Sequence, residues 1–185
     1  MAFSNSDFYG EALYLFGANG WTQIDGGALS FAVGANSLYD VLPDRKNYEI
    51  RQYTGSPITY NWQTIDYVKP GLDPIPSIAA GGGLYERRAD NSTWEYTGTP
   101  CNGTTCPGWV KIDNHNSLGP VAGSNTVYQI RVTEREAVSI WQYTGTPCSG
   151  RVCSGWVQLD DNPNTKSIVA GPVPFGFSVS AGPAR

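Results

Sequence analysis

Short segments rich in β-branched and aromatic residues, with polar neighbours and a turn after each, run along the whole chain. Three examples, EIRQYTG (49–55), TWEYTG (93–98) and SIWQYTG (139–145), end in the same Thr-Gly pair. This pattern is typical of β-strands bounded by turns. No stretch keeps the apolar spacing of a helix over three turns. The pattern therefore predicts an all-β protein with many short strands.

One motif, Trp-x-x-Ile/Leu-Asp, recurs four times and sets the period of the chain. Its tryptophans, Trp21, Trp62, Trp109 and Trp156, are 41, 47 and 47 residues apart. After each copy comes a small-residue segment, and after the first three also a Tyr-bearing strand and an aromatic strand; PFGFS (174–178) stands in place of the Tyr-bearing strand after the fourth. The small-residue segments are SFAVG (30–34), SIAAG (77–81), GPVAG (119–123) and SIVAG (167–171). Four short strands in each unit of roughly 40 to 50 residues are typical of a β-propeller blade.

The fourth unit is divided between the two ends of the chain. The segment after Trp156 lacks the aromatic strand, and ALYLFGANG (12–20) supplies one just before Trp21. We predict a single β-propeller domain, residues 1–185, with units at about 21–61, 62–108, 109–155 and 156–185 plus 1–20. The predicted fold has four four-stranded blades. The N-terminal strand completes the C-terminal blade and closes the ring, which removes an open sheet edge.

The repeated residues are expected to be architectural. The Trp of each motif is placed at the start of a blade, and the Trp and Ile or Leu are predicted to pack between neighbouring blades. The Asp of the motif is predicted to accept backbone N–H bonds in a turn. The small-residue segment is predicted to be the innermost strand, because strands that converge on an axis leave little room.

Composition and charge restrict the partners. Charged residues make up 15% of the chain and the net charge is −4. A nucleic-acid partner is not expected, since no basic stripe exists to neutralise phosphates, and no segment approaches the roughly 18 apolar residues of a membrane span. The N-terminus MAFSNSDFYG has no visible signal peptide, so we predict a cytoplasmic protein or one secreted without such a signal. The oligomeric state is left open.

Two cysteine pairs lie at equivalent turns, in YTGTPCNGTTCPGWVKID (96–113) and YTGTPCSGRVCSGWVQLD (143–160). Four thiolates could bind zinc, but equivalent turns of neighbouring blades should lie far apart. Local disulfides within each turn, Cys101–Cys106 and Cys148–Cys153, are favoured, with free thiols as the alternative in a reducing compartment. No metal or other cofactor is predicted.

The succession W-x-x-I/L-D, I-A/V-A-G, L-Y and I-W-x-Y-T-G resembles the tectonin and tachylectin-like β-propeller repeat over essentially the whole chain. The resemblance implies a sugar-binding lectin, with glycan sites at blade tops or between blades and no enzymatic activity. Two departures stand out. Relatives usually have more than four blades, and the copies here differ at the positions expected to touch a ligand.

Sugar binding requires an aromatic face for the apolar side of the ring and polar groups for its hydroxyls. Residues of these types at equivalent places in the units are the predicted ligand-binding residues: Trp94, Trp141, Arg51, Tyr14, Tyr39, Tyr85, Tyr128, Arg87 and Arg131. Packing between blades is the alternative for the tryptophans, and half-buried strand positions for the tyrosines. Arg51 replaces a Trp, and because an unpaired buried guanidinium is costly, it is predicted to reach solvent or a polar ligand.

No catalytic residue is predicted. The single histidine, His115, lies in a polar turn, and the chain has neither a nucleophile elbow nor a phosphate-binding loop. A second hypothesis is nevertheless an enzyme, a cyclase or pericyclase such as a Diels–Alderase, whose one asymmetric pocket orients a hydrophobic metabolite. A third is a structural or protein-interaction propeller. The expected partners are glycans or a small organic ligand.

Overall fold

The computed structural model describes residues 11–34, 37–44, 47–55, 61–69, 76–133, 137–171 and 178–181. The described residues form sixteen strands and no helix, so no helix there is long and apolar enough to cross a membrane. Every strand pairing is antiparallel. The predicted all-β class is confirmed.

Three sheets have four strands each, in chain order. The first sheet contains β3 (Ser30–Val33), β4 (Leu38–Asp44), β5 (Asn47–Tyr53) and β6 (Trp62–Val68). The second contains β7 (Ser77–Ala80), β8 (Leu84–Arg87), β9 (Thr93–Tyr96) and β10 (Trp109–Asp113). The third contains β11 (Ser117–Ala122), β12 (Val127–Val132), β13 (Val138–Tyr143) and β14 (Trp156–Asp160).

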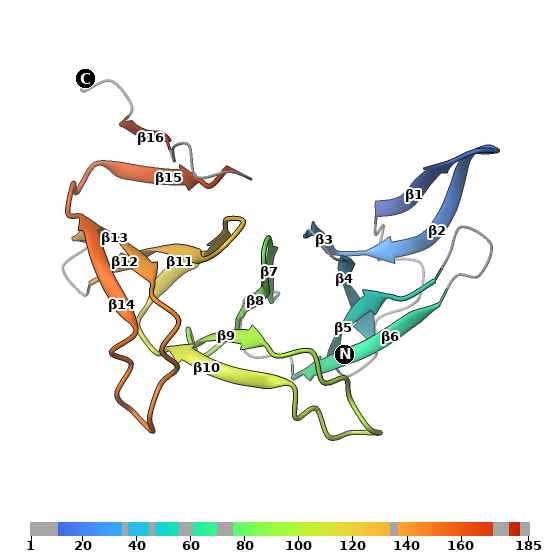
Figure 1. The fold of residues 1–185 in the computed structure, drawn as a ribbon, viewed down its shortest axis with the longest axis horizontal. Coiled ribbons are helices and arrows are strands. Elements are labelled where there is room, and N and C mark those ends of the chain that lie inside the picture. The colour runs from blue at the N-terminus through green and yellow to red at the C-terminus, as the bar shows by residue number, and fades with distance from the viewer. Residues whose placement is uncertain are drawn as a thin grey trace, which may run out of the picture.

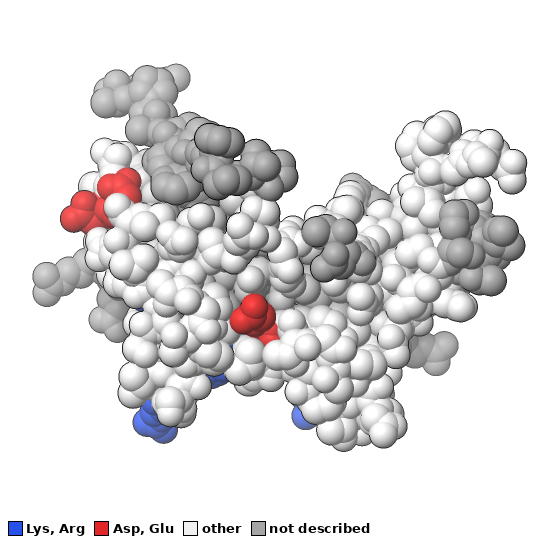
Figure 2. Space-filling model, viewed as in Figure 1, with Lys and Arg blue, Asp and Glu red and all other residues white. Residues whose placement is uncertain are grey.

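Two further pairs of strands flank these sheets. The N-terminal hairpin consists of β1 (Glu11–Gly17) and β2 (Gly20–Ala28), and the C-terminal hairpin of β15 (Thr165–Val169) and β16 (Ser178–Ala181). Figure 1 shows the three sheets arranged along an arc, with the two hairpins at its opposite ends. The expected closed ring of four four-stranded blades is therefore not seen among the described residues. Figure 2 shows an open notch between the two ends, on a face with few charged side chains.

Each four-stranded sheet begins with a small-residue segment and ends with a Trp-x-x-Ile/Leu-Asp strand. In the second and third sheets, Trp109 lies opposite Tyr96, and Trp156 opposite Tyr143. The Trp is thus in the last strand of its own sheet, and the expectation that it opens the next blade is wrong. The reason is the turn before it, which folds the chain back so that the aromatic strand and the Trp strand pair as a hairpin.

The small-residue strands lie at the inner side of the arc, as the sequence predicted. Figure 1 shows β3, β7 and β11 turned toward its middle and β6, β10 and β14 along its outside. A β-carbon at Gly81 would lie 2.1 Å from the carbonyl oxygen of Gly123, and one at Gly34 would lie 2.9 Å from that of Gly81. Backbones of neighbouring sheets therefore approach too closely here for a side chain.

Neighbouring elements meet at three similar junctions. The first joins the N-terminal hairpin to the first sheet, the second joins the first sheet to the second, and the third joins the second sheet to the third. At each, a Trp indole N–H donates to the carbonyl of the motif Ile in the preceding element: Trp62 to Ile24 at 3.1 Å, Trp109 to Ile65 at 2.8 Å and Trp156 to Ile112 at 2.6 Å. The predicted packing of motif Trp and Ile between units is confirmed at these junctions.

The hydrophobic core is divided among the junctions. Val41, Ile50 and Ile65 of the first sheet are fully buried and pack with Leu84 and Trp109 of the second. A corresponding cluster lies between the second and third sheets. In it, Tyr85 and Ile112 contact Val127, Tyr143 and Trp156. Because the sheets are small, each depends on its neighbours to bury its apolar face.

Candidate functional site

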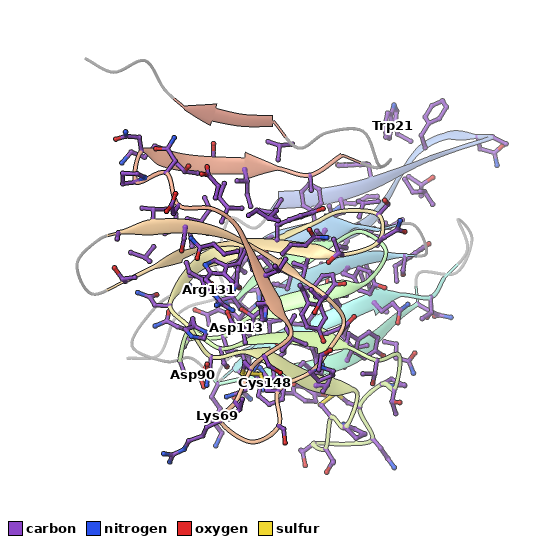
Figure 3. The ribbon with its side chains drawn as sticks, turned by 60° about the vertical axis from the view of Figure 1, so that its left-hand side comes forward. Trp21, Lys69, Asp90, Asp113, Arg131 and Cys148 are labelled. Atoms are coloured by element: carbon purple, nitrogen blue, oxygen red, sulfur yellow. A yellow bond between two sulfur atoms is a disulfide. The ribbon has the colours of Figure 1, made fainter. Side chains whose placement is uncertain are left out.

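The Asp of the repeated motif forms an ion pair with an arginine of the following sheet at all three junctions. The pairs are Asp25–Arg51, Asp66–Arg88 and Asp113–Arg131. Asp113 receives Nε and Nη2 of Arg131 at 3.0 Å each, and Figure 3 shows the two side chains next to one another. The predicted turn capping is seen at Asp160, which accepts the N–H groups of Asp161 at 2.9 Å and Asn162 at 3.2 Å. Asp25 and Asp66 also accept the N–H of the next residue, at 2.7 Å and 2.8 Å, but these bonds lie within strands β2 and β6.

Arg51 belongs to this set of ion pairs. Its Nε lies 3.0 Å from Asp40, and its Nη2 also contacts Asp25. In the first sheet Leu42 stands at the register position of Arg88 and Arg131, and Arg51 supplies the guanidinium from the neighbouring strand instead. The cation that the sequence analysis singled out is therefore neutralised by two carboxyl groups of the protein.

Trp94 and Trp141 occupy the position of Arg51 in the second and third sheets, and they contact the arginines Arg88 and Arg131. The guanidinium of Arg88 lies 4.2 Å from the ring centre of Trp94, and that of Arg131 lies 4.2 Å from that of Trp141. Each indole N–H donates to a serine two residues before it in the same strand region. Cation–π contact and packing at the junctions account for both rings.

A third polar position at each junction carries Asp40, Glu86 or Gln129. Burial raises the pKa of Asp40 to about 7 and that of Glu86 to about 8, although Arg51 and Arg88 oppose these shifts. Burial would also raise the pKa of Asp25, but hydrogen bonds with Asp40 and Gly26 and the charge of Arg51 lower it below its ordinary value. Asp40 and Glu86 contact the arginine of their junction, whereas Gln129 donates to Asp113, the partner of Arg131.

Among the described residues, a cleft of about 450 Å³ lies between the second and third sheets. It is lined by Tyr85, Glu95, Asn125, Thr126, Gln142, Tyr143, Thr144 and Gly145. One wall comes from β8 and β9, and the other from β13 and the loop before β12. The lining combines two aromatic rings with a carboxyl group, two carboxamides and hydroxyl groups.

The two tyrosines and Glu95 form the inner end of this cleft. Burial raises the pKa of Glu95, which a hydrogen bond from Tyr85 partly offsets. Burial and the charge of Glu95 raise the pKa of Tyr143 to about 12, and raise that of Tyr85 as well. The hydroxyl of Tyr143 is buried and has no hydrogen-bond partner among the residues that the structure describes, which is uncommon for a buried polar group.

The other predicted ligand-binding residues are not brought to this cleft. Tyr39 is buried in the core between the first and second sheets, and Tyr14 is exposed on β1. Tyr128 packs near Ile168 of the C-terminal hairpin, and Arg87 contacts Asn91. Of the predicted set, Tyr85 lines the cleft.

Sequence reasoning missed the polar residues Glu95, Asn125 and Gln142. A signal was present, because the third unit carries Gly-Ser-Asn-Thr (123–126) where the second carries three glycines (81–83). The sequence repeat does not show which loop faces the neighbouring sheet, so this difference alone could not assign these residues to a cleft.

Both predicted disulfides, Cys101–Cys106 and Cys148–Cys153, are present, and the described residues include no free cysteine. The loops they close also contact the preceding sheet. The Cys101 N–H donates to the carbonyl of Thr64 at 3.2 Å, and the Cys148 N–H to that of Lys111 at 2.9 Å. Each disulfide loop therefore adds a backbone hydrogen bond to the junction between its own sheet and the preceding one.

His115 lies in an exposed turn, with its Nδ1 2.7 Å from Asp113. In the part of the chain that the structure describes, no group of three or more His, Cys, Asp or Glu side chains is arranged to hold a metal ion.

Comparisons with protein-family models, with curated proteins and with solved structures found no match to this chain.

Proposed function

We propose that the protein binds carbohydrate without enzymatic activity, as the tectonin-like repeat implies, and that the saccharide occupies the cleft between the second and third sheets. The observation that carries the proposal is the lining of this cleft. Glu95, Asn125 and Gln142 offer planar acceptors and donors for hydroxyl groups, and the buried side chains of Tyr85 and Tyr143, each 4% exposed, lie beneath them.

For the fold, we extend the four sequence units to four propeller blades. Three blades are the four-stranded sheets. The two hairpins carry the strands of the fourth: the C-terminal hairpin corresponds to the inner two strands of a blade, and the N-terminal hairpin to the outer two. The sequence order of small-residue, Tyr-bearing, aromatic and Trp strands supports this combination.

The two disulfides favour an oxidising compartment, because such bonds persist outside the reducing cytosol. In such a compartment, the ligands that the protein can reach are the glycans of cell surfaces and secreted molecules.

A glycan array followed by calorimetry tests the binding proposal. We expect Gln142→Ala and Asn125→Ala each to weaken binding of the best saccharide by about two- to tenfold, the loss of one or two hydrogen bonds. Gln63→Ala is the matched control, since Gln63 is an exposed strand glutamine in the first sheet, away from the cleft. All three variants should keep the thermal stability of the wild type.

The same assay separates the alternatives. Absence of glycan binding, together with one tightly held apolar molecule per chain, would favour the pocket enzyme. That hypothesis drew on Arg51, whose guanidinium is engaged by Asp25 and Asp40, and on Phe175-Gly-Phe177, which lies outside the described residues. Binding of neither class would favour a structural or protein-interaction role.

A further inference from the structure

One aromatic pair that is buried or half-buried at each junction is exposed at the N-terminal hairpin. Each Trp strand pairs its Trp with an aromatic ring of the preceding strand, and in the hairpin this pair is Phe16 and Trp21, with ring centres 5.0 Å apart. The exposed fractions are 66% for Phe16 and 70% for Trp21, against 9% for Trp109 and 8% for Trp156. Figure 3 shows Trp21 away from the sheets that bury its counterparts.

The surface that would receive such a pair is uncovered at the other end of the arc. The motif Ile is 5% exposed at Ile24 and 0% exposed at Ile65 and Ile112, whereas Leu159, the fourth copy, is 38% exposed. Val157, on the same strand, is 47% exposed. No described hydrogen bond brings a Trp indole to the carbonyl of Leu159, as Trp156 is brought to that of Ile112.

Within the described ranges, no strand pairs with the outer edge of β1 or of β16. In each four-stranded sheet the second and third strands pair antiparallel, as β12 does with β13. The C-terminal hairpin contains the counterparts of the first and second strands, with β16 as the second. The N-terminal hairpin contains the counterparts of the third and fourth strands, with β1 as the third. A pairing of β16 with β1 would complete a four-stranded sheet and remove both edges.

We infer that the N-terminal hairpin of one copy docks on the third sheet and C-terminal hairpin of a second copy, head to tail. In this contact the Trp21 indole N–H donates to the carbonyl of Leu159 in the other copy, in the geometry of the three junctions within each chain. In the sequence repeat, the strand with Trp21 follows the strand with Leu159 as Trp156 follows Ile112. The N-terminal hairpin of one copy would therefore meet the third sheet of the other in the same way as neighbouring elements meet at the three junctions within the chain.

A second copy fits better than closure within one chain. The N-terminal hairpin is fixed to the first sheet by Trp62–Ile24 and Asp25–Arg51, and β15 is fixed to the third sheet by Ile168. Both ends are thus held apart by close-packed junctions (Figure 1). Closure within the chain would distort all three, whereas a second copy leaves each unchanged.

The new junction should be weaker than those within the chain, because it lacks their ion pair. Register places Ala181 opposite Thr165, where Arg131 lies opposite Ser117 in the third sheet. Asp160 instead accepts the backbone N–H groups of Asp161 and Asn162. Apolar contact and strand pairing would carry the association, which makes it dependent on concentration.

Complementation between two defective chains tests the inference. Trp21→Arg damages the head and Leu159→Arg damages the tail, and both side chains are exposed enough for each variant to fold. Sedimentation velocity should show self-association of the wild type and a dissociation constant raised at least tenfold in each variant alone. An equimolar mixture should form a one-to-one heterodimer, identified by native mass spectrometry, since it retains one intact head and one intact tail.

Three results would overturn the inference: a wild type that is monomeric at every concentration, variants that associate as the wild type does, or a mixture without heterodimer. A monomer in which Trp21 is shielded from a fluorescence quencher would indicate closure within the chain. None of these results bears on saccharide binding, because the cleft lies between the second and third sheets of each copy.

Discussion

At the residue scale, the position shared by Asp40, Glu86 and Gln129 decides how each junction responds to pH. Each side chain is fully buried and lies next to the ion pair of its junction. Glutamine at the third junction donates to Asp113, and a protonated carboxyl group at the second can play the same part. The same position beside the ion pair is thus occupied by an ionisable carboxyl group at two junctions and by a neutral carboxamide at the third.

Glu86 is expected to make the protein less stable as pH rises. Its pKa is raised from 4.5 to about 8 in the folded state, so the folded state binds a proton that the unfolded state has lost. The stabilisation is fully present below about pH 4.5 and is lost as pH rises through about 8. Between about pH 6 and pH 9 we expect the unfolding free energy of the wild type to fall by about 1 kcal/mol or more.

Chemical denaturation of Glu86→Gln measured across this range checks the assignment. The variant should lose much of the slope and be more stable than the wild type at the alkaline end. The reverse change, Gln129→Glu, is the matched control and should steepen the slope. Equal slopes in all three proteins would show that Glu86 is not the titrating group.

The arginine pairs illustrate what sequence reasoning could reach at this scale. Arg51 was recognisable as the residue that breaks the repeat. Its partners were not, because they lie 26 and 11 residues away in the chain. Strand pairing within the first sheet places Asp40 opposite Arg51, and the packing of the N-terminal hairpin on that sheet brings Asp25 to it. Turn capping by the motif Asp is local, and it was predictable for that reason.

At the element scale, the inner strands are limited by backbone contact. Any side chain at Gly81 meets the carbonyl of Gly123 of the next sheet, and that oxygen cannot move without displacing β11.

We therefore expect Gly81→Ala to lower the unfolding free energy by about 2 kcal/mol or more, as overpacking against a fixed backbone does. Thermal unfolding followed by circular dichroism measures the loss. Ala79→Ser, a change of similar size at a half-buried position of the same strand, is the comparison. Unchanged melting of Gly81→Ala would mean that the sheets do not approach as described.

Strand identity and order within the units could be predicted, because alternation and turn residues are local signals. The position of the Trp strand was not. The repeat has the same period wherever the unit is started, so the sequence could not show which strand begins a sheet. Pairing of Tyr96 with Trp109 across the disulfide loop resolves it.

At the scale of the whole molecule, the repetition of four-stranded sheets was predictable and the open arrangement of the two ends was not. The fourth blade would join the two ends of the chain, the pairing with the greatest loop-closure cost. The structure leaves those ends apart, with Trp21 and Leu159 uncovered. The cleft arises at this scale too, from residues on two sheets, and of the predicted set it includes Tyr85.

The most direct test of the central claim is to map saccharide binding on the ¹⁵N-labelled protein by NMR, using the best glycan of the array. The account predicts saturable shifts concentrated in the amides that line the cleft: Tyr85, Glu95, Asn125, Thr126 and 142–145. Shifts concentrated on another surface, or none with any glycan, would contradict it.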